Sequence, residues 1–209
     1  MIEPAKFALF VGVSWALIIA PGPDMLYVIT RGIAYGRRAG ILSAIGVICG
    51  ILVHTTAAAF GLTLIFQTSA FAFLIVKYIG TIYLIYLGVK AWRDKNTFSL
   101  QPSFAVANPR SLFWQGVMSN VLNPKIAVFF LAFLPQFVDR ESSQVTMQMM
   151  ILGLTFALFG LCFLILVGFF AGAVATRLSR LPQYTRLLRW LTGGILFGLG
   201  VRLMFTEQR

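Results

Sequence analysis

Hydrophobic residues form long continuous runs along the chain, and polar residues are mostly confined to the short segments between them. Each run is long enough to cross the hydrocarbon core of a bilayer, which needs about 20 apolar residues. The hydrophobic positions are continuous rather than alternating, which predicts helices and argues against the strands of a β-barrel. The six runs cover approximately residues 7–29, 41–66, 71–92, 113–137, 147–174 and 187–206.

The composition supports a membrane protein and argues against a nucleic-acid partner. Hydrophobic residues make up 59% of the 209 residues and charged residues 11%, whereas soluble proteins contain about 25% charged residues. A net charge of +11 would favour nucleic-acid binding in a soluble protein. Here the basic residues lie in short loops between apolar runs, as expected for loops that face anionic lipid headgroups. The expected macromolecular partner is therefore the lipid bilayer.

The basic residues also predict the orientation of the chain. Eleven of the 17 Lys and Arg residues lie in the connections after the first, third and fifth runs. They are Arg31, Arg37, Arg38, Lys90, Arg93, Lys95, Arg110, Arg177, Arg180, Arg186 and Arg189. The positive-inside rule places these three connections in the cytoplasm and both termini outside. The N-terminal MIEPAKF has no basic segment typical of a signal peptide, so the first run is expected to remain in the protein.

The chain shows weak internal similarity between its two halves. The segment KYIGTIYLIYLGVKAW (77–92) aligns with RWLTGGILFGLGVRLM (189–204), and Gly88 falls on Gly200. The first run of each half is also interrupted by proline, within APGPD in one half and LNPK in the other. Three runs per half is an odd number, so two similar halves would point in opposite directions across the membrane.

These features predict an all-α integral membrane protein with one membrane domain, 1–209. It would contain six transmembrane helices arranged as two inverted three-helix repeats. The first repeat would cover 1–92 and the second 113–209, with a polar cytoplasmic linker at 93–112.

Two charged residues, Asp24 and Lys125, lie well inside the apolar runs, and each directly follows a proline. A charge at the centre of a membrane helix costs about 2.5–3.5 kcal/mol on insertion scales, so such residues commonly have a function. We expect the two side chains to face one another near the middle of the membrane. They form either a structural ion pair between the halves or a site for a zwitterion such as an α-amino acid. In the second case Lys125 would bind the carboxylate and Asp24 the ammonium.

The proline breaks beside these charges expose backbone groups that a substrate could use. Asn120 and Asn123 lie within about a turn of Lys125 and offer neutral hydrogen bonds. Asn123 is equally well explained as a partner for backbone groups freed by proline. The expected substrate-binding residues are Asp24, Lys125, Asn123, Asn120, Pro21, Gly22, Pro23 and Pro124.

Asp24 is the first candidate for proton coupling and His54, within the second run, is the other. A buried histidine is more often a hydrogen-bonded core residue than a proton carrier, and that alternative stays open for His54. Tyr78, Tyr83 and Tyr86 recur at helical spacing in the third run, where packing is the first interpretation and pocket lining the second.

Small residues four positions apart occur in several runs, for example Gly46 with Gly50 and Gly194 with Gly198. They are expected to pack helices within the chain, and the alternative is a homodimer interface. Cys49 and Cys162 lie in apolar runs without the spacing of metal ligands and are expected to be core residues. No metal or cofactor site is predicted.

Several motifs together resemble the LysE/RhtB family of amino-acid exporters. They are PGPDML in the first run, YLIYLG in the third and NPKIAVFFLAFLPQF in the fourth. The resemblance covers nearly the whole chain. It implies a carrier in the bacterial inner membrane that exports amino acids, in exchange for protons. It directs attention to the PGPD and NPK residues, and it does not select a substrate.

A neutral amino acid, of the threonine, homoserine or leucine type, is preferred as substrate. A basic amino acid would need a second buried acid, and the runs contain none besides Asp24. A metal-ion exporter of related fold would need several converging acids, cysteines or histidines. An enzyme acting on lipid would need a nucleophile beside a base, so no enzymatic activity is predicted.

Overall fold

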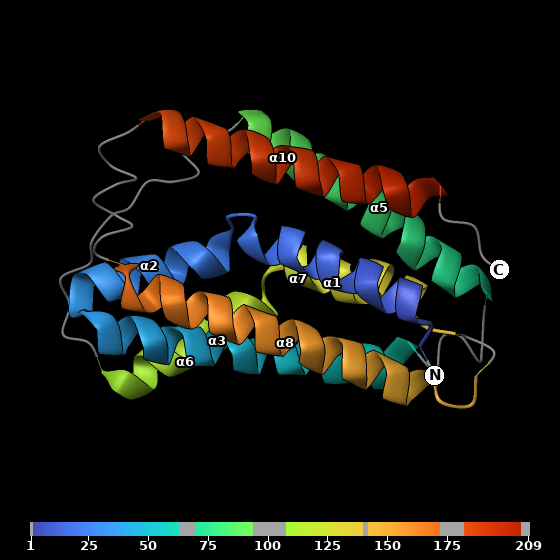
Figure 1. Ribbon diagram of the computed structural model, residues 1–209, viewed down its shortest axis with the longest axis horizontal. Helices are drawn as coiled ribbons and strands as arrows, with labels where there is room; N and C mark the ends of the chain where they lie inside the picture. Colours follow the sequence, from blue (N-terminus) through green and yellow to red (C-terminus); the bar gives the residue numbers. More distant parts are fainter. Residues whose placement is uncertain (1, 63–69, 94–107, 140–141, 172–181, 206–209) are drawn as a thin grey trace.

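The computed structural model describes residues 2–62, 70–93, 108–139, 142–171 and 182–205. Within these ranges the chain is helical with short connections, and no strand is present. The helices run along the length of the molecule (Figure 1). In chain order they are α1 (Pro4–Ile19), α2 (Pro23–Tyr35), α3 (Arg37–Ala57), the π-helix η1 (Ala58–Leu62), α5 (Ala70–Arg93), α6 (Pro109–Val121), α7 (Pro124–Val128), the π-helix η2 (Phe129–Phe133), the 3-10 helix η3 (Leu134–Phe137), α8 (Val145–Phe169) and α10 (Pro182–Phe205).

Two of the predicted apolar runs are broken helices. The pair α1 and α2 is bent by 48°, and α6 with the segment Pro124–Phe137 is bent by 47°. Pro23 begins α2 and Pro124 begins α7. Proline is well suited to the first turn, where the backbone N–H would have no partner within the helix. The interruptions predicted at APGPD and LNPK are therefore confirmed.

Three helical segments are long and apolar enough to cross a membrane by themselves: Arg37–Gly61, Leu74–Arg93 and Val145–Phe169. Counting each bent pair as one span raises the number to five. The sixth predicted run falls on α10, which is not among these candidate spans in the described part of the chain. The total of six stays a prediction, as does the linker at 93–112, of which residues 94–107 lie outside the described ranges.

The helices separate into a larger group and a pair. Helices α5 and α10 pack along one another, and the other helices lie below them in the view of Figure 1. The start of α1 and the end of α10 lie at one end of the molecule, whereas α2, α5 and α8 all end toward the other (Figure 1). The basic connections that follow these three helices therefore begin on one side, as the charge distribution predicts.

Glycines allow α5 and α10 to approach closely. A Cβ atom at Gly88 would lie 2.8 Å from the backbone nitrogen of Phe197, and one at Gly200 would lie 2.8 Å from the side chain of Ile85. In the alignment of 77–92 with 189–204, Gly88 falls on Gly200 and Ile85 falls on Phe197. The two contacts are thus equivalent under the alignment of the halves.

Intramolecular packing is also confirmed for Gly46 and Gly50, which lie against α6. Gly194 and Gly198 differ, because a Cβ atom at either would meet nothing within 4 Å. The expectation that both cysteines are core residues is wrong for Cys162, which is exposed on α8. Its apolar neighbours Leu158 and Leu166 are exposed as well, so Cys162 belongs to an outward apolar surface that suits lipid.

The close α5–α10 contact predicts unequal effects of two glycine substitutions. Gly88→Ala should destabilise the protein by about 1–3 kcal/mol, because the added methyl group overlaps the backbone of α10. Gly198→Ala should leave stability unchanged or slightly raised, because its methyl group meets open space. Thermal unfolding of the detergent-purified variants measures both effects. Equal melting temperatures for the two variants would contradict this account of the interface.

Candidate functional site

The first break leaves a backbone carbonyl that the helix itself cannot satisfy. In a continuous helix the carbonyl of Leu17 would accept a hydrogen bond from residue 21, but Pro21 has no N–H. The ammonium of Lys125 takes this place and donates to the carbonyl oxygens of Leu17, at 2.9 Å, and Ala20, at 2.7 Å. Gly22 lies beside it, and a Cβ atom there would be 3.4 Å from Lys125 Nζ. Lys125 therefore closes the end of α1.

The second break has the same deficiency and a similar solution. The carbonyl of Asn120 would accept from residue 124, and Pro124 has no N–H. It accepts instead from the backbone N–H of Asn123, at 2.8 Å, and from His54 Nε2, at 3.1 Å. Since a carbonyl can only accept, Nε2 of His54 carries the proton in this arrangement. The ring of His54 also stacks on Phe130.

The carboxylate of Asp24 is held by two amides. The side-chain nitrogens of Asn120 and Asn123 both donate to Asp24 Oδ2, at 2.9 and 2.8 Å. The side-chain oxygen of Asn123 accepts from the backbone N–H of Lys125 and so caps α7. Asn123 therefore satisfies backbone next to Pro124 and also contacts Asp24, whereas its role in binding a substrate stays a prediction.

Two oxygens of this network have no hydrogen-bond donor among the residues that the structure describes. They are Asp24 Oδ1 and Asn120 Oδ1, and both are buried. A buried acceptor without a donor costs about 1–3 kcal/mol. Both are acceptors, so the network as it stands would be completed by a donor: a proton on the carboxylate, a water or an ammonium group.

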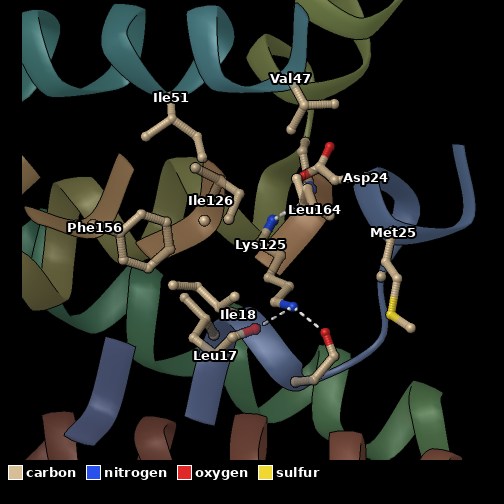
Figure 2. A pocket seen from close by; sticks show the side chains of 14 residues that line it. Leu17, Ile18, Asp24, Met25, Val47, Ile51, Lys125, Ile126, Phe156 and Leu164 are labelled. Carbon is tan, nitrogen blue, oxygen red and sulfur yellow. Dashed lines mark hydrogen bonds between the residues drawn. The ribbon is translucent and has the colours of Figure 1, made fainter. Parts of the chain in front are cut away.

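A small cavity of about 40 Å³ lies at the break and includes Asp24, Asn123 and Lys125 in its lining. In Figure 2 the Lys125 ammonium points toward the carbonyl oxygens at the end of α1 and away from the carboxylate of Asp24. A water molecule needs about 10–15 Å³ measured in this way. The cavity is therefore large enough for water but too small for an amino acid.

A larger cavity of about 410 Å³ adjoins the small one, within the range of about 300–1,000 Å³ for ligand pockets. Gly22, Asn123 and Lys125 line both cavities. The opposite wall comes from α5 and α10. The remaining lining residues are Pro21, Pro23, Leu26, Tyr83, Leu87, Lys90, Ala91, Pro124, Thr192 and Leu196.

The structure brings the predicted site residues together but arranges the charges differently. We expected Asp24 and Lys125 to face one another, and they form no ion pair within 4.0 Å in the described part of the chain. Lys125 instead donates to the backbone carbonyls of Leu17 and Ala20. These residues are distant in the sequence, so the residues around Lys125 could not predict this contact. Of the three tyrosines, Tyr83 lines the larger cavity, and Tyr86 lines a neighbouring hollow with Lys90 and Arg93. Tyr78 is exposed and lines neither.

Sequence reasoning missed the role of Gly50. A Cβ atom at this position would lie 2.7 Å from Asn120 Cβ and 2.9 Å from its Oδ1, so only glycine leaves room for that side chain. It also missed Tyr27, whose hydroxyl donates to the carbonyl of Leu112 at 2.6 Å and ties α2 to α6. The prediction of small-residue packing on α3 was the signal that could have found Gly50.

The carbonyl contacts of Lys125 predict a structural penalty for its removal. Lys125→Met should destabilise the protein by about 1–3 kcal/mol, because two buried carbonyls lose their donor. Lys90→Met is the matched control, because the described residues offer its exposed ammonium no hydrogen bond or ion pair. Thermal unfolding in detergent compares the two variants. A Lys125→Met protein as stable as wild type would refute the closing role of this lysine.

Comparison with known proteins places this arrangement in a family. Residues 15–207 match the LysE type translocator family. An uncharacterized membrane protein of Bacillus subtilis, YrhP, is 30% identical over 203 residues, which cover 92% of this chain and 95% of the relative. No solved structure matches the chain.

Two similar proteins are named for efflux. The leucine efflux protein of Klebsiella pneumoniae is 32% identical over 191 residues, covering 90% of this chain and 89% of that protein. The homoserine/homoserine lactone efflux protein of Salmonella typhimurium is 33% identical over 142 residues, or 68% of each chain. The family match includes both breaks, so the predicted resemblance is confirmed, and the chain is a multi-pass membrane protein that belongs to the LysE type translocator family.

Proposed function

We propose that this protein is a secondary transporter that exports neutral amino acids in exchange for protons. The efflux proteins similar to it, named for leucine and for homoserine, support the substrate class. The observation that carries the proposal is the carboxylate of Asp24 at the meeting of the two breaks, whose buried Oδ1 has no donor among the described residues. A bound ammonium and a bound proton would each supply that donor.

Competition for one carboxylate oxygen gives a simple exchange mechanism. The ammonium of the substrate binds Asp24 Oδ1 while the carboxylate is charged. A proton that arrives from the other side neutralises the carboxylate and removes the attraction for the ammonium. Substrate and proton therefore occupy the site alternately. His54 supports this network through the carbonyl of Asn120, and it is the second candidate for carrying the proton.

Alternating access would come from two inverted three-helix halves that move relative to one another. The similar bends of 48° and 47° in the first helix pair of each half support this plan. The equivalent contacts of Gly88 and Gly200 support it independently. A homodimer would need a surface on which helices of two copies can pack. Gly194 and Gly198 are small residues with open space beside them and could form such a surface.

In this proposal the end with the basic connections faces the cytoplasm and both termini lie outside, as the positive-inside rule predicts. With this orientation in the bacterial inner membrane, export moves the substrate toward the end that carries the termini. A zwitterion has no net charge, so its movement is insensitive to the membrane potential. An inward proton gains about 2.3 kcal/mol per 100 mV, which can drive the exchange.

A transport assay tests the proposed function directly. Purified protein in liposomes loaded with leucine or homoserine should release the amino acid faster when protons are more concentrated outside. Collapsing the pH gradient with a proton carrier should slow release, because the exchange loses its driving force. Protein-free liposomes correct for leakage. Release of neither amino acid, nor of any other in a panel, would refute the assignment as an amino-acid exporter.

Replacing Asp24 separates transport from folding. Asp24→Asn should abolish transport, a loss of at least about a hundredfold, because an amide neither attracts the ammonium nor takes up the proton. The protein should remain folded, since an amide oxygen can accept the hydrogen bonds of Asn120 and Asn123. Size-exclusion profiles and thermal unfolding check the fold. Transport at the wild-type rate by this variant would exclude Asp24 as the exchange site.

A further inference from the structure

The carboxylate of an amino-acid substrate needs a cationic partner, and Lys125 is already engaged. Its ammonium donates to two carbonyl oxygens and is buried at the end of α1. If it turned to a substrate carboxylate, the carbonyls of Leu17 and Ala20 would lose their donor in an apolar surrounding. The binding mode in which Lys125 holds the carboxylate is therefore costly in this arrangement.

The larger cavity offers another cation. Lys90 lies on α5 one turn before its end and lines the cavity opposite the break. Its side chain is exposed, and among the described residues no hydrogen bond or ion pair engages its ammonium. Lys90 also lines the neighbouring hollow of about 380 Å³ with Tyr86, Val89 and Arg93. It therefore stands where the cavity continues toward the basic end of the molecule.

The volume of the cavities decides where a substrate can sit in this state. The cavity at Asp24, of about 40 Å³, excludes an amino acid, whereas the adjoining one of about 410 Å³ accommodates it. Gly22 and Asn123 belong to both linings, so a molecule in the larger cavity lies next to the break. Apolar wall residues such as Leu26, Leu87 and Leu196 suit an aliphatic side chain.

We propose that Lys90 binds the α-carboxylate of the substrate in the cavity between α5, α10 and the two breaks. The substrate's ammonium then points toward the break and Asp24, and its side chain contacts the leucines. This entry site rests on the proposed function as an amino-acid exporter. It replaces the binding mode in which Lys125 receives the carboxylate, and it makes Lys90 a residue that distinguishes amino acids from amines and esters.

Transport kinetics of three variants test the role of Lys90. Lys90→Gln should raise the KM for leucine by about tenfold, the effect of losing one hydrogen bond between charged groups. The maximal rate should change little, and Lys90→Arg should keep the KM near wild type. Arg38→Gln is the matched control, because it removes a positive charge at the same end from an exposed residue that lines neither cavity. Its KM should equal that of wild type.

A substrate analogue separates carboxylate binding from a general effect of charge. Leucinamide keeps the ammonium and the side chain of leucine but has no carboxylate. Its inhibition constant for leucine transport should be the same for wild type and Lys90→Gln, so that only the acid loses affinity. An unchanged KM for leucine, or an equal loss for leucine and leucinamide, overturns the proposal. Absence of transport by the wild-type protein instead refutes the proposed function, so the two failures are distinguishable.

Discussion

The fold depends on satisfying the carbonyls that two proline breaks leave open inside an apolar protein. In a bilayer no water replaces a missing helical N–H, and each open carbonyl must find a donor within the protein. Lys125 supplies that donor at the first break and His54 at the second. The polar side chains of the candidate site are therefore also the groups that make the broken helices tolerable.

Each half of the chain supplies the hydrogen-bond donor for the break in the other half. Lys125 belongs to the second half and closes α1 in the first, whereas His54 belongs to the first half and contacts the break between α6 and α7. Asn120 and Asn123 similarly reach across to Asp24. Any motion that separates the breaks must find new donors for these groups. In the proposed transport mechanism, this requirement would couple access to the site with the hydrogen bonds between the two breaks.

The two cavities lie on one path, with the small cavity at Asp24 next to the larger one. Asp24, whose Oδ1 has no donor among the described residues, lines a space large enough only for water. The adjoining larger space extends between the breaks and the pair α5 and α10. Helices α5 and α10 approach one another closely at Gly88 and Gly200, which occupy equivalent positions. The wall of the large cavity is therefore formed by a closely packed unit opposite the polar breaks, an arrangement that suits a site between moving parts.

The sequence by itself determined the helical membrane class, the places of both breaks, the family and the identity of the charged residues. These follow from the bilayer, which demands long apolar helices and makes every proline and charge within them conspicuous. It did not determine which groups those charges contact. Asp24 and Lys125 have opposite charges and matching positions, yet the carbonyl freed by Pro21 takes the ammonium, and the amides of Asn120 and Asn123 take the carboxylate. Only the tertiary structure decides such partners, because they come from distant helices whose separation depends on packing, as at Gly50 against Asn120.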